Sequence, residues 1–508
     1  MITRIFYNQN NFITGEAVDK ALTYFIVLLV SGCVSAILLF LNENIFAALA
    51  LIFVVVIMLL TFYRVEWGFY IFFGMVLFFD QFNIPNFSPI TYRFDYFKNL
   101  KEISYIPSFS SAVLNPLELQ LILLLLAWFI AVSVNKKTKV QSITAWGLAL
   151  IFLVTLIASM LHGLSTGGVF LPALWELRAF FYFGFLYFFV PQIIQTKEQI
   201  STLLWIFIAC VTVKALQGIV RFTAQGLSFR GMETLTNHED PVFITILIML
   251  LLAFVLFNAK VKHRTVLLWL LLPLIFGFFT GQRRASYGGL IISFVVLVVL
   301  LSGRERLLLF KSLAPFLIVA AIYSAVFWNS ESKLASPVKL IKSAFFTDKE
   351  EAGERYLSNL YREFERYDLA YTVSSSPVTG LGFGKKYLMP IPLAEIPFPL
   401  RDYIPHNEIL WLIVKMGAAG FFVFWFFFDS ILFKSSALCT RMRDPFLKSV
   451  CAIVIISFVN QIAVSYYDLQ LTYYRNMVLL GTLWGLLPAI ESLDKQDKEK
   501  PIVVKEIL

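Results

Sequence analysis

The sequence predicts an all-α polytopic integral membrane protein with about 14 transmembrane helices, in the range 12–14, and composition is the first reason. Of its 508 residues, 59% are hydrophobic and only 15% are charged, whereas soluble domains carry about 25% charged and roughly 45–50% apolar residues. Aromatic residues make up 17% of the chain, which suits helices in lipid with aromatic belts at the interfaces. This composition argues against a soluble enzyme, a secreted domain and a disordered chain.

Long apolar runs are the second reason, because a helix needs about 20 apolar residues to cross the hydrocarbon core. The third run is short and is a candidate re-entrant segment. The first run is too long for the apolar region of a signal peptide, and no cleavage-site pattern follows it. In chain order the runs cover 20–41, 45–63, 66–80, 115–134, 143–160, 174–193, 200–221, 241–258, 264–280, 285–302, 308–328, 406–433, 446–465 and 475–490.

The distribution of basic residues predicts the orientation of these helices. Lys and Arg gather in alternate connections, which is the pattern of cytoplasmic loops. Both termini are then cytoplasmic, and the long segments 81–114 and 329–405 lie on the periplasmic side. The net charge of +9 therefore reflects the loops of one side, and we expect no nucleic-acid partner. The basic connections hold Arg64; Lys136, Lys137 and Lys139; Lys197; Lys260, Lys262 and Arg264; Arg304, Arg306 and Lys311; and Lys434, Arg441, Arg443 and Lys448.

The runs and connections divide the chain into four parts. Residues 1–328 hold the first eleven helices, 329–405 form one large periplasmic loop with amphipathic helices, 406–490 hold the last three helices, and 491–508 form a cytoplasmic tail. The sequence shows no duplicated half, which argues against the inverted-repeat plan of many transporters. Its four cysteines have no paired spacing, so we expect neither a disulfide framework nor a zinc site.

Arginines on the periplasmic side depart from this charge pattern and are candidate binding residues. Arg283 and Arg284 are adjacent in the short loop 280–286, which holds no other charge. Two neighbouring guanidinium groups repel each other, and an anion between or beside them explains the pair most simply. Arg230 lies in an earlier periplasmic loop. The alternative for each arginine is snorkelling or a pair with a carboxylate.

Two further arginines, Arg178 and Arg475, lie near the periplasmic ends of their helices. An arginine near hydrocarbon is costly without a partner. Snorkelling or pairing with Glu176 or Glu239 is an equally good explanation, so Arg178 is a lower-ranked site residue.

His406 is the candidate catalytic residue, because it lies at the periplasmic mouth of a helix with a carboxylate two residues further on. Histidine titrates near neutrality and suits general acid–base work. Asn407 and Glu408 follow it and are secondary candidates. His238, in the periplasmic loop that also holds Arg230, is the second choice of histidine.

The large periplasmic loop is expected to contain one amphipathic helix over 351–373. Its apolar residues recur at helical spacing and are expected to lie on the helix bundle or the membrane surface. Its charged residues are predicted to form a mostly solvated face with i,i+4 pairs. The glycine-rich segment 380–384 lacks the lysine of a phosphate loop and is predicted to be a flexible turn. The apolar set is Leu357, Leu360, Phe364, Tyr367 and Tyr371, and the charged set is Glu354, Arg355, Arg362, Glu363, Glu365 and Arg366.

Four motifs in one order resemble the O-antigen ligase and O-antigen polymerase superfamily of bacterial membrane glycosyltransferases. They are T-G-Q-R-R, P-V-T-G-L-G-F-G, P-H-N-E-I-L and K-M-G-A-A-G, and the resemblance covers about 230–420. It implies a GT-C-like fold with a periplasmic cavity. The matching positions lining that cavity are Arg230, Arg283 or Arg284, Arg355, and His406 with Asn407. Where the family commonly has an acidic residue nine positions after the histidine, this chain has Lys415, and Glu408 is the candidate substitute.

The resemblance implies an inverting glycosyltransferase of the bacterial inner membrane. A glycan would move from undecaprenyl pyrophosphate to a hydroxyl of a lipid or glycan acceptor at the periplasmic face. In this scheme Arg230, Arg283 and Arg284 bind the pyrophosphate, and His406 orients or deprotonates the acceptor. The sequence shows no Asp-x-Asp motif on that side and no metal-spaced cluster, so we expect no metal and no cofactor. A polymerase joining lipid-linked repeat units remains the alternative to a ligase. A flippase or a non-catalytic assembly subunit would not need His406.

Overall fold

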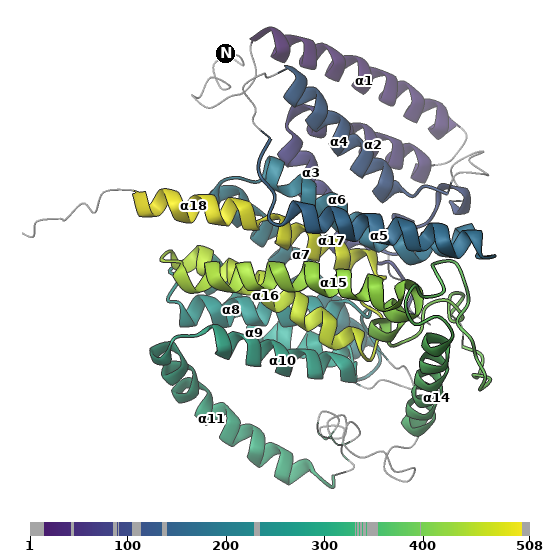
Figure 1. Ribbon diagram of the computed structural model, residues 1–508. Coiled ribbons are helices and arrows are strands. Elements are labelled where there is room, and N and C mark those ends of the chain that lie inside the picture. The colour runs from purple at the N-terminus through teal and green to yellow at the C-terminus, as the bar shows by residue number, and fades with distance from the viewer. Residues whose placement is uncertain are drawn as a thin grey trace, which may run out of the picture. The chain divides into compact units, whose positions relative to one another are not determined.

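A computed structural model describes residues 15–41, 45–84, 89, 91–103, 113–134, 140–227, 234–330, 332, 335, 338, 342, 354–396 and 398–499. In these ranges the chain is helical and contains no β-strand (Figure 1). Each of the fourteen apolar runs forms a helix. The all-α prediction is therefore confirmed for the described part of the chain.

Eight of the helices are long and apolar enough to cross a membrane. Six more helices contain a shorter apolar stretch. A multi-pass membrane protein is thus supported, while the count of 14 spans and the periplasmic position of the large loop remain predictions. The eight are α4 (Pro116–Val134), α5 (Trp146–Ser165), α6 (Phe170–Ile193), α7 (Lys197–Ala224), α9 (Lys262–Thr280), α15 (Glu408–Arg441), α16 (Pro445–Ser465) and the segment Tyr474–Glu499, which comprises α17 (Tyr474–Gly485) and α18 (Leu487–Glu499).

The chain separates into two compact units, and the smaller comprises residues 1–83, 88–141 and 192–194. In it α1 (Gly15–Leu41) packs on α2 (Ile45–Tyr63), and α3 (Val65–Phe78) packs on α2 and α4. The short turn η2 (Leu100–Glu102) lies in the connection between α3 and α4. Tyr96 in this connection donates a hydrogen bond to Gln120 of α4 at 2.7 Å. The candidate site residues that the structure describes lie outside this unit.

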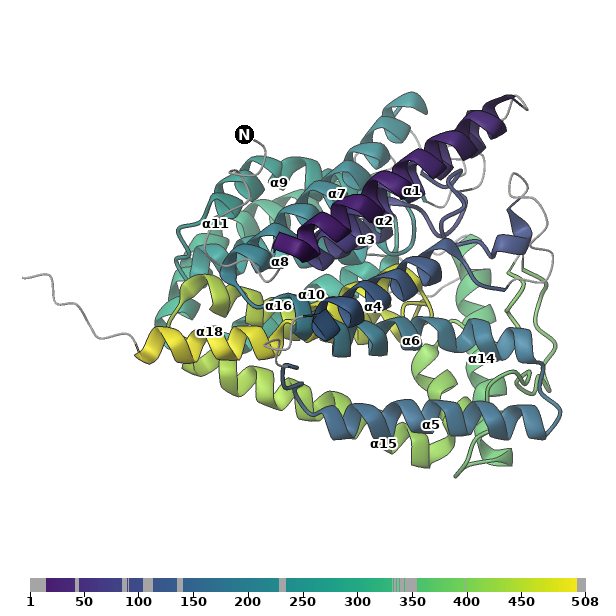
Figure 2. The same ribbon diagram turned by 90° about the horizontal axis from the view of Figure 1, so that it is seen from above.

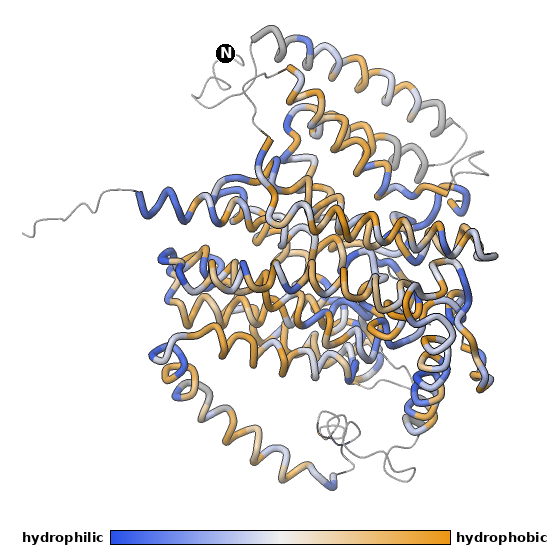
Figure 3. Tube along the Cα trace, in the orientation of Figure 1, coloured by the Kyte–Doolittle hydropathy of each residue, from blue (hydrophilic) through white to orange (hydrophobic). Residues whose placement is uncertain are grey.

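The larger unit comprises residues 84–87, 142–191 and 195–508 and holds the candidate site. Its helices α5, α15 and α16 run side by side (Figures 1 and 2). On the other flank of α16 lie α8 (Asp240–Leu256) and α10 (Arg284–Leu300), and α9 packs between α7 and α8. Rings fill the centre, as where Phe428 stacks on Phe458 at 4.7 Å. Hydrophobic residues dominate these helices, and α14 (Glu354–Ser375), which crosses their direction, is more polar (Figure 3). The unit also holds α11 (Gly303–Phe327), α17, α18 and most of α6.

The long helix α15 is interrupted near its beginning by Gly417, whose φ of 63° and ψ of −175° are not helical. The opened backbone hydrogen-bonds with the segment 377–382 of the large loop. Ala418 donates to the carbonyl of Pro377 at 2.8 Å, and Gly382 donates to the carbonyl of Lys415 at 3.0 Å. The loop is therefore joined to α15 through main-chain groups.

The glycine-rich segment 380–384 was predicted to be a flexible turn. In the structure it is held in place by its contacts with neighbouring helices. Gly382 has a φ of +83°, and a Cβ atom there would lie 2.3 Å from the Cα of Gly163 in α5. Only glycine combines this conformation with so close an approach. The carboxylate of Glu176 in α6 accepts the N–H of Gly384 at 2.6 Å and lies 2.7 Å from the Nζ of Lys415. This buried pair fastens the segment to α6 and α15.

Candidate functional site

His406 and Glu365 form an ionisable pair just before α15 begins. The Nδ1 of His406 lies 3.1 Å from one carboxylate oxygen of Glu365, and the backbone N–H of His406 donates to the other at 3.0 Å. The Glu365 side chain is buried, whereas that of His406 is one-quarter exposed. A carboxylate that accepts from Nδ1–H leaves Nε2 as the basic nitrogen. The geometry thus suits a histidine that accepts a proton on Nε2.

Glu365 reaches His406 because α14 packs by a mixed face, which includes Leu369, rather than by its predicted apolar stripe. Glu365, Asp368 and Thr372, at helical spacing, are buried. The predicted apolar stripe points away from the protein, with Leu357 68% and Tyr367 57% exposed. Glu365 is therefore an exception within the charged face, most of which was expected to be solvated. The stripe was expected to contact either the helix bundle or the membrane surface. In the part of the chain that the structure describes it does not contact the bundle, so contact with the membrane surface remains the expectation.

A second cluster joins three loops through Arg283, His238 and Asp468. Arg283 contacts the Nε2 of His238 through Nη2, and its Nη1 lies 3.8 Å from Asp468. The Nδ1 of His238 lies 3.5 Å from the same carboxylate oxygen. A carboxylate partner was the alternative explanation for the Arg283–Arg284 pair, and Arg283 has such a partner in Asp468.

The charge on Asp468 is stabilised by its neighbours. Burial alone would raise the pKa of this carboxyl, but His238, Arg283 and Arg362 together hold the pKa well below its usual range. Asp468 is therefore ionised at every pH at which such a protein works. Arg362 belongs to α14, so this helix contributes a charge to the cluster of Arg283, His238 and Asp468. The neighbouring residue on the helix, Tyr361, packs its ring edge-on against His406, with 5.6 Å between the ring centres.

Arg283 and Arg362, the two arginines beside Asp468, each have a hydrogen-bond donor that is not used by any described residue. In the described part of the chain, the Nε atoms of Arg283 and Arg362 are buried and have no hydrogen-bond partner. A guanidinium group presents its donors in a planar fork that fits phosphate oxygens. These two side chains are therefore candidate anion ligands.

The other sequence-predicted residues have different environments. Asn407 caps α15 by accepting the N–H of Leu410 at 3.0 Å. Glu408 is buried and accepts the main-chain N–H groups of 470–472, so it holds the loop that carries Asp468. Arg284 is half-buried and Arg178 is buried in α6. Arg230 and the side chain of Arg355 lie outside the described residues.

The two buried arginines, Arg475 and Arg178, differ in their relation to the carboxylates that were expected to pair with them. Arg475 lies 2.9 Å from Asp240 and 3.7 Å from Glu239, so pairing with a carboxylate is confirmed for it. Glu176, which was considered as the partner of Arg178, instead holds Lys415. Lys415 occupies the position at which the O-antigen ligase and polymerase superfamily commonly has an acidic residue. Its charge is paired with that of Glu176.

Sequence reasoning missed Glu365, Arg362 and Asp468. A signal existed for Asp468, because it is the one carboxylate between the last two apolar runs. For Glu365 the signal was a second stripe at helical spacing, Tyr361–Glu365–Asp368–Thr372, which was masked by the apolar stripe. No group of three or more His, Cys, Asp or Glu side chains arranged to hold a metal ion occurs in the ranges that the structure describes.

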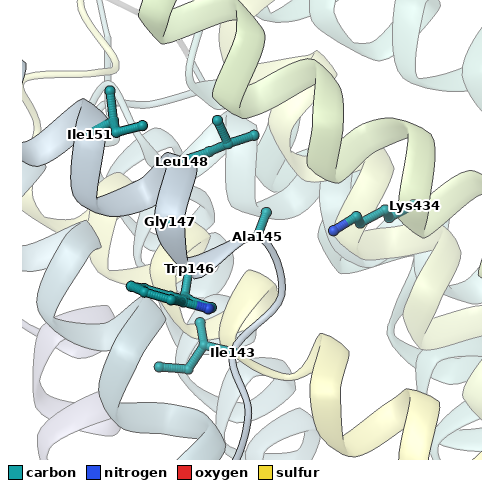
Figure 4. Close-up of a pocket in the computed structure, with 7 residues that line it drawn as sticks. All are labelled: Ile143, Ala145, Trp146, Gly147, Leu148, Ile151 and Lys434. Carbon is teal, nitrogen blue, oxygen red and sulfur yellow. The ribbon is translucent and has the colours of Figure 1, made fainter.

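A surface recess elsewhere in the larger unit does not contain these residues. It lies where α5 begins, and Figure 4 shows its lining of mostly apolar residues with one charge, Lys434. Lys434 is far along α15 from His406, in a connection predicted to be cytoplasmic. The recess is lined by Ile143, Ala145, Trp146, Gly147, Leu148, Ile151 and Lys434.

Comparison with known proteins identifies the segment that carries the first cluster. Residues 266–425 match the family model described as O-antigen ligase. The matched segment includes Arg283, Arg284, all of α14 and His406, and it confirms the resemblance over this part of the chain. No curated protein matches the chain.

Proposed function

We propose that this chain, with its O-antigen ligase segment, is a membrane glycosyltransferase that moves a glycan from undecaprenyl pyrophosphate to an acceptor hydroxyl at the periplasmic face. The family match supports the class of reaction. The observation that carries the proposal is the pair of contacts from Glu365 to His406. A histidine with an unshared Nε2, oriented by a buried carboxylate, is the arrangement that deprotonates a hydroxyl.

The proposed reaction is a single displacement. The acceptor oxygen forms a bond to the anomeric carbon while the bond from that carbon to the pyrophosphate oxygen breaks. The acceptor proton passes to Nε2 of His406, and undecaprenyl pyrophosphate leaves as the anion. Attack opposite the leaving group inverts the anomeric configuration. Glu365 stabilises the positive charge that develops on the imidazole, as an orienting carboxylate does in other nucleophile–base pairs.

The leaving group needs compensation for its developing negative charge. Arg283 and Arg362 supply guanidinium donors on the side of the site where Asp468 lies. Arg284 and Arg230 are proposed as further pyrophosphate ligands, as their position in the sequence suggests. Asp468 and His238 hold Arg283 in position, which limits the reorganisation needed when the donor binds.

A polymerase joining lipid-linked repeat units would use the same donor chemistry and differ in its acceptor. The product therefore distinguishes the two: one transferred glycan on a different lipid for a ligase, and a ladder on the donor lipid for a polymerase. A flippase would have no use for the base formed by His406 and Glu365.

The test is donor turnover by the purified protein in detergent, where transport between compartments cannot contribute. The host's undecaprenyl-linked glycan and an envelope lipid extract are supplied, with and without EDTA, and release of undecaprenyl pyrophosphate is followed. His406→Ala should lower release about 10²–10⁴-fold. His162→Ala, at an exposed position, is the matched control and should leave release unchanged. Equal release by wild type and His406→Ala would overturn the assignment.

A further inference from the structure

Four polar atoms beside His406 are left without partners. Within the described ranges, the hydroxyls of Tyr361 and Tyr387, one carboxylate oxygen of Asp368 and the amide nitrogen of Asn407 are buried and form no hydrogen bond. Asp368 and Tyr387 are almost fully buried as residues. A buried polar group without a partner costs free energy, so such groups are few in folded proteins and require an explanation.

These atoms belong to one region around the His406–Glu365 pair. Tyr361 and Asp368 lie one turn to either side of Glu365 on α14. The segment with Tyr387 runs along the same helix, because Leu388 donates to the hydroxyl of Thr372 at 2.9 Å and Ile391 donates to the paired oxygen of Asp368 at 3.0 Å. Burial and then the nearby Glu365 raise the pKa of both tyrosines, that of Tyr361 to about 12. Both hydroxyls are therefore protonated and able to donate as well as accept.

The chemistry of this set selects a neutral, polyhydroxylated ligand. Asp368 offers an acceptor, Asn407 offers a donor, and each tyrosine hydroxyl offers both. Sugar hydroxyls donate and accept in the same way. A phosphate is disfavoured, because the carboxylates of Glu365 and Asp368 both lie close enough to Tyr387 to raise its pKa. The arginines that suit the pyrophosphate lie instead beside Asp468.

We propose that Tyr361, Asp368, Tyr387 and Asn407 form the subsite for the acceptor saccharide, which places its reacting hydroxyl at Nε2 of His406. The assignment to the acceptor rests on the proposed glycosyltransferase function. The four atoms are closed off from solvent, so the saccharide reaches them as α14 moves relative to the segment 387–391. Three hydrogen bonds join that segment to α14 in the described ranges, two at Thr372 and one at Asp368.

The first arm of the test measures binding without turnover. The probe is the water-soluble saccharide released by mild acid from the host's envelope glycolipids. It is titrated into the purified full-length protein while the thermal unfolding midpoint is recorded, because a ligand of the folded state raises that midpoint saturably. Tyr387→Phe and Asp368→Asn should each raise the half-saturating concentration about tenfold. Tyr367→Phe removes a hydroxyl from the exposed face of the same helix and should leave it unchanged.

The second arm separates recognition from structural support. Without saccharide, Tyr387→Phe should unfold at the same or a higher temperature than wild type, because it removes a hydroxyl that has no partner in the described structure. A clear fall in the midpoint would assign the hydroxyl to a structural water and overturn the subsite. So would the absence of saturable stabilisation of the wild type by the probe.

The remaining outcomes distinguish the subsite from the function. Saccharide binding that depends on Tyr387, without release of undecaprenyl pyrophosphate in the turnover assay, refutes the transferase and leaves the subsite standing. Turnover in which both variants keep the wild-type acceptor KM refutes the subsite alone. The saccharide released from the donor lipid is a second probe. If Tyr387 matters for that probe only, the assignment to the acceptor is wrong.

Discussion

Glu365 binds His406 twice, through the imidazole Nδ1 at 3.1 Å and through the backbone N–H at 3.0 Å. One carboxylate therefore fixes both the ring and the point at which the loop enters α15. Because Glu365 belongs to α14 and His406 precedes α15, the position of the proposed base depends on how α14 packs. The proposed base and the orphaned polar atoms meet there, and Arg362, a proposed pyrophosphate ligand, lies on the same helix.

Glu365→Gln tests the role of this carboxylate. The amide keeps the size of the side chain but removes the charge that stabilises the protonated imidazole. We expect kcat to fall about 10²-fold, near the lower end of the contribution of general base catalysis, while the KM for the donor stays near the wild-type value. Initial rates of undecaprenyl pyrophosphate release measure both. Glu363→Gln, at an exposed position on the same helix, is the control. An equal loss in both variants would assign the effect to the helix as a whole.

Arg283→Gln and Arg362→Gln test the pyrophosphate ligands. Each change removes a charge-assisted donor, for which a loss of about tenfold in affinity is typical. Binding of undecaprenyl pyrophosphate in detergent, followed at two salt concentrations, measures the loss. Arg366→Gln, on the exposed face of α14, should bind as the wild type does. Unchanged binding by the Arg283→Gln/Arg284→Gln double variant would rule out this loop as a pyrophosphate ligand.

Asp468→Asn tests the charge that holds Arg283. The pKa of Asp468 is lowered in the folded protein, so its stabilising contribution is complete above the unfolded value of about 3.9 and is lost as the pH falls through the folded value. The wild type should therefore have the higher unfolding midpoint at about pH 5 and above. That margin should begin to shrink below about pH 4. Thermal unfolding between about pH 3 and pH 8 measures it, and a margin that is absent near pH 7 would contradict the pairing.

Gly382→Ala tests the attachment of the large loop. A φ of +83° and a Cβ position 2.3 Å from the Cα of Gly163 combine backbone strain with overlap. Together these cost about 2–5 kcal/mol, so we expect a lower unfolding midpoint and less folded protein in the membrane. Gly147→Ala is the control, because a Cβ atom there meets no atom within 4 Å among the described residues. Equal midpoints for the two variants would show that the segment adjusts freely.

The helices were predictable because their cause is local. A segment that crosses lipid must satisfy its backbone N–H and C=O groups by hydrogen bonds within the segment, which a helix does. All fourteen apolar runs are helical. The helix of the large loop was expected over 351–373 and is found at Glu354–Ser375. Its orientation was not predictable from periodicity, since an apolar stripe can face protein or lipid. The stripe is exposed, and the mixed face is buried instead.

The site could be predicted in part for the same reason. His406 and Arg283 were selected from the sequence because a histidine and an unbalanced charge on the predicted periplasmic side are unusual in their own neighbourhoods. Glu365 and Asp468 are ordinary where they stand in the sequence. They become recognisable as site residues only in the folded protein, where α14 brings Glu365 to His406 and the loop after α16 brings Asp468 to Arg283.

The junction between the segment 377–382 and the opened start of α15 is made by main-chain hydrogen bonds, such as those from Ala418 to Pro377 and from Gly382 to Lys415. Main-chain groups are the same in every residue except for the missing N–H of proline. Most side chains of the segment can therefore be exchanged without loosening the junction, provided that the glycines at its closest approaches are kept. The loop therefore keeps its attachment to α15 while exposed side chains of the segment, such as Val378, are free to vary.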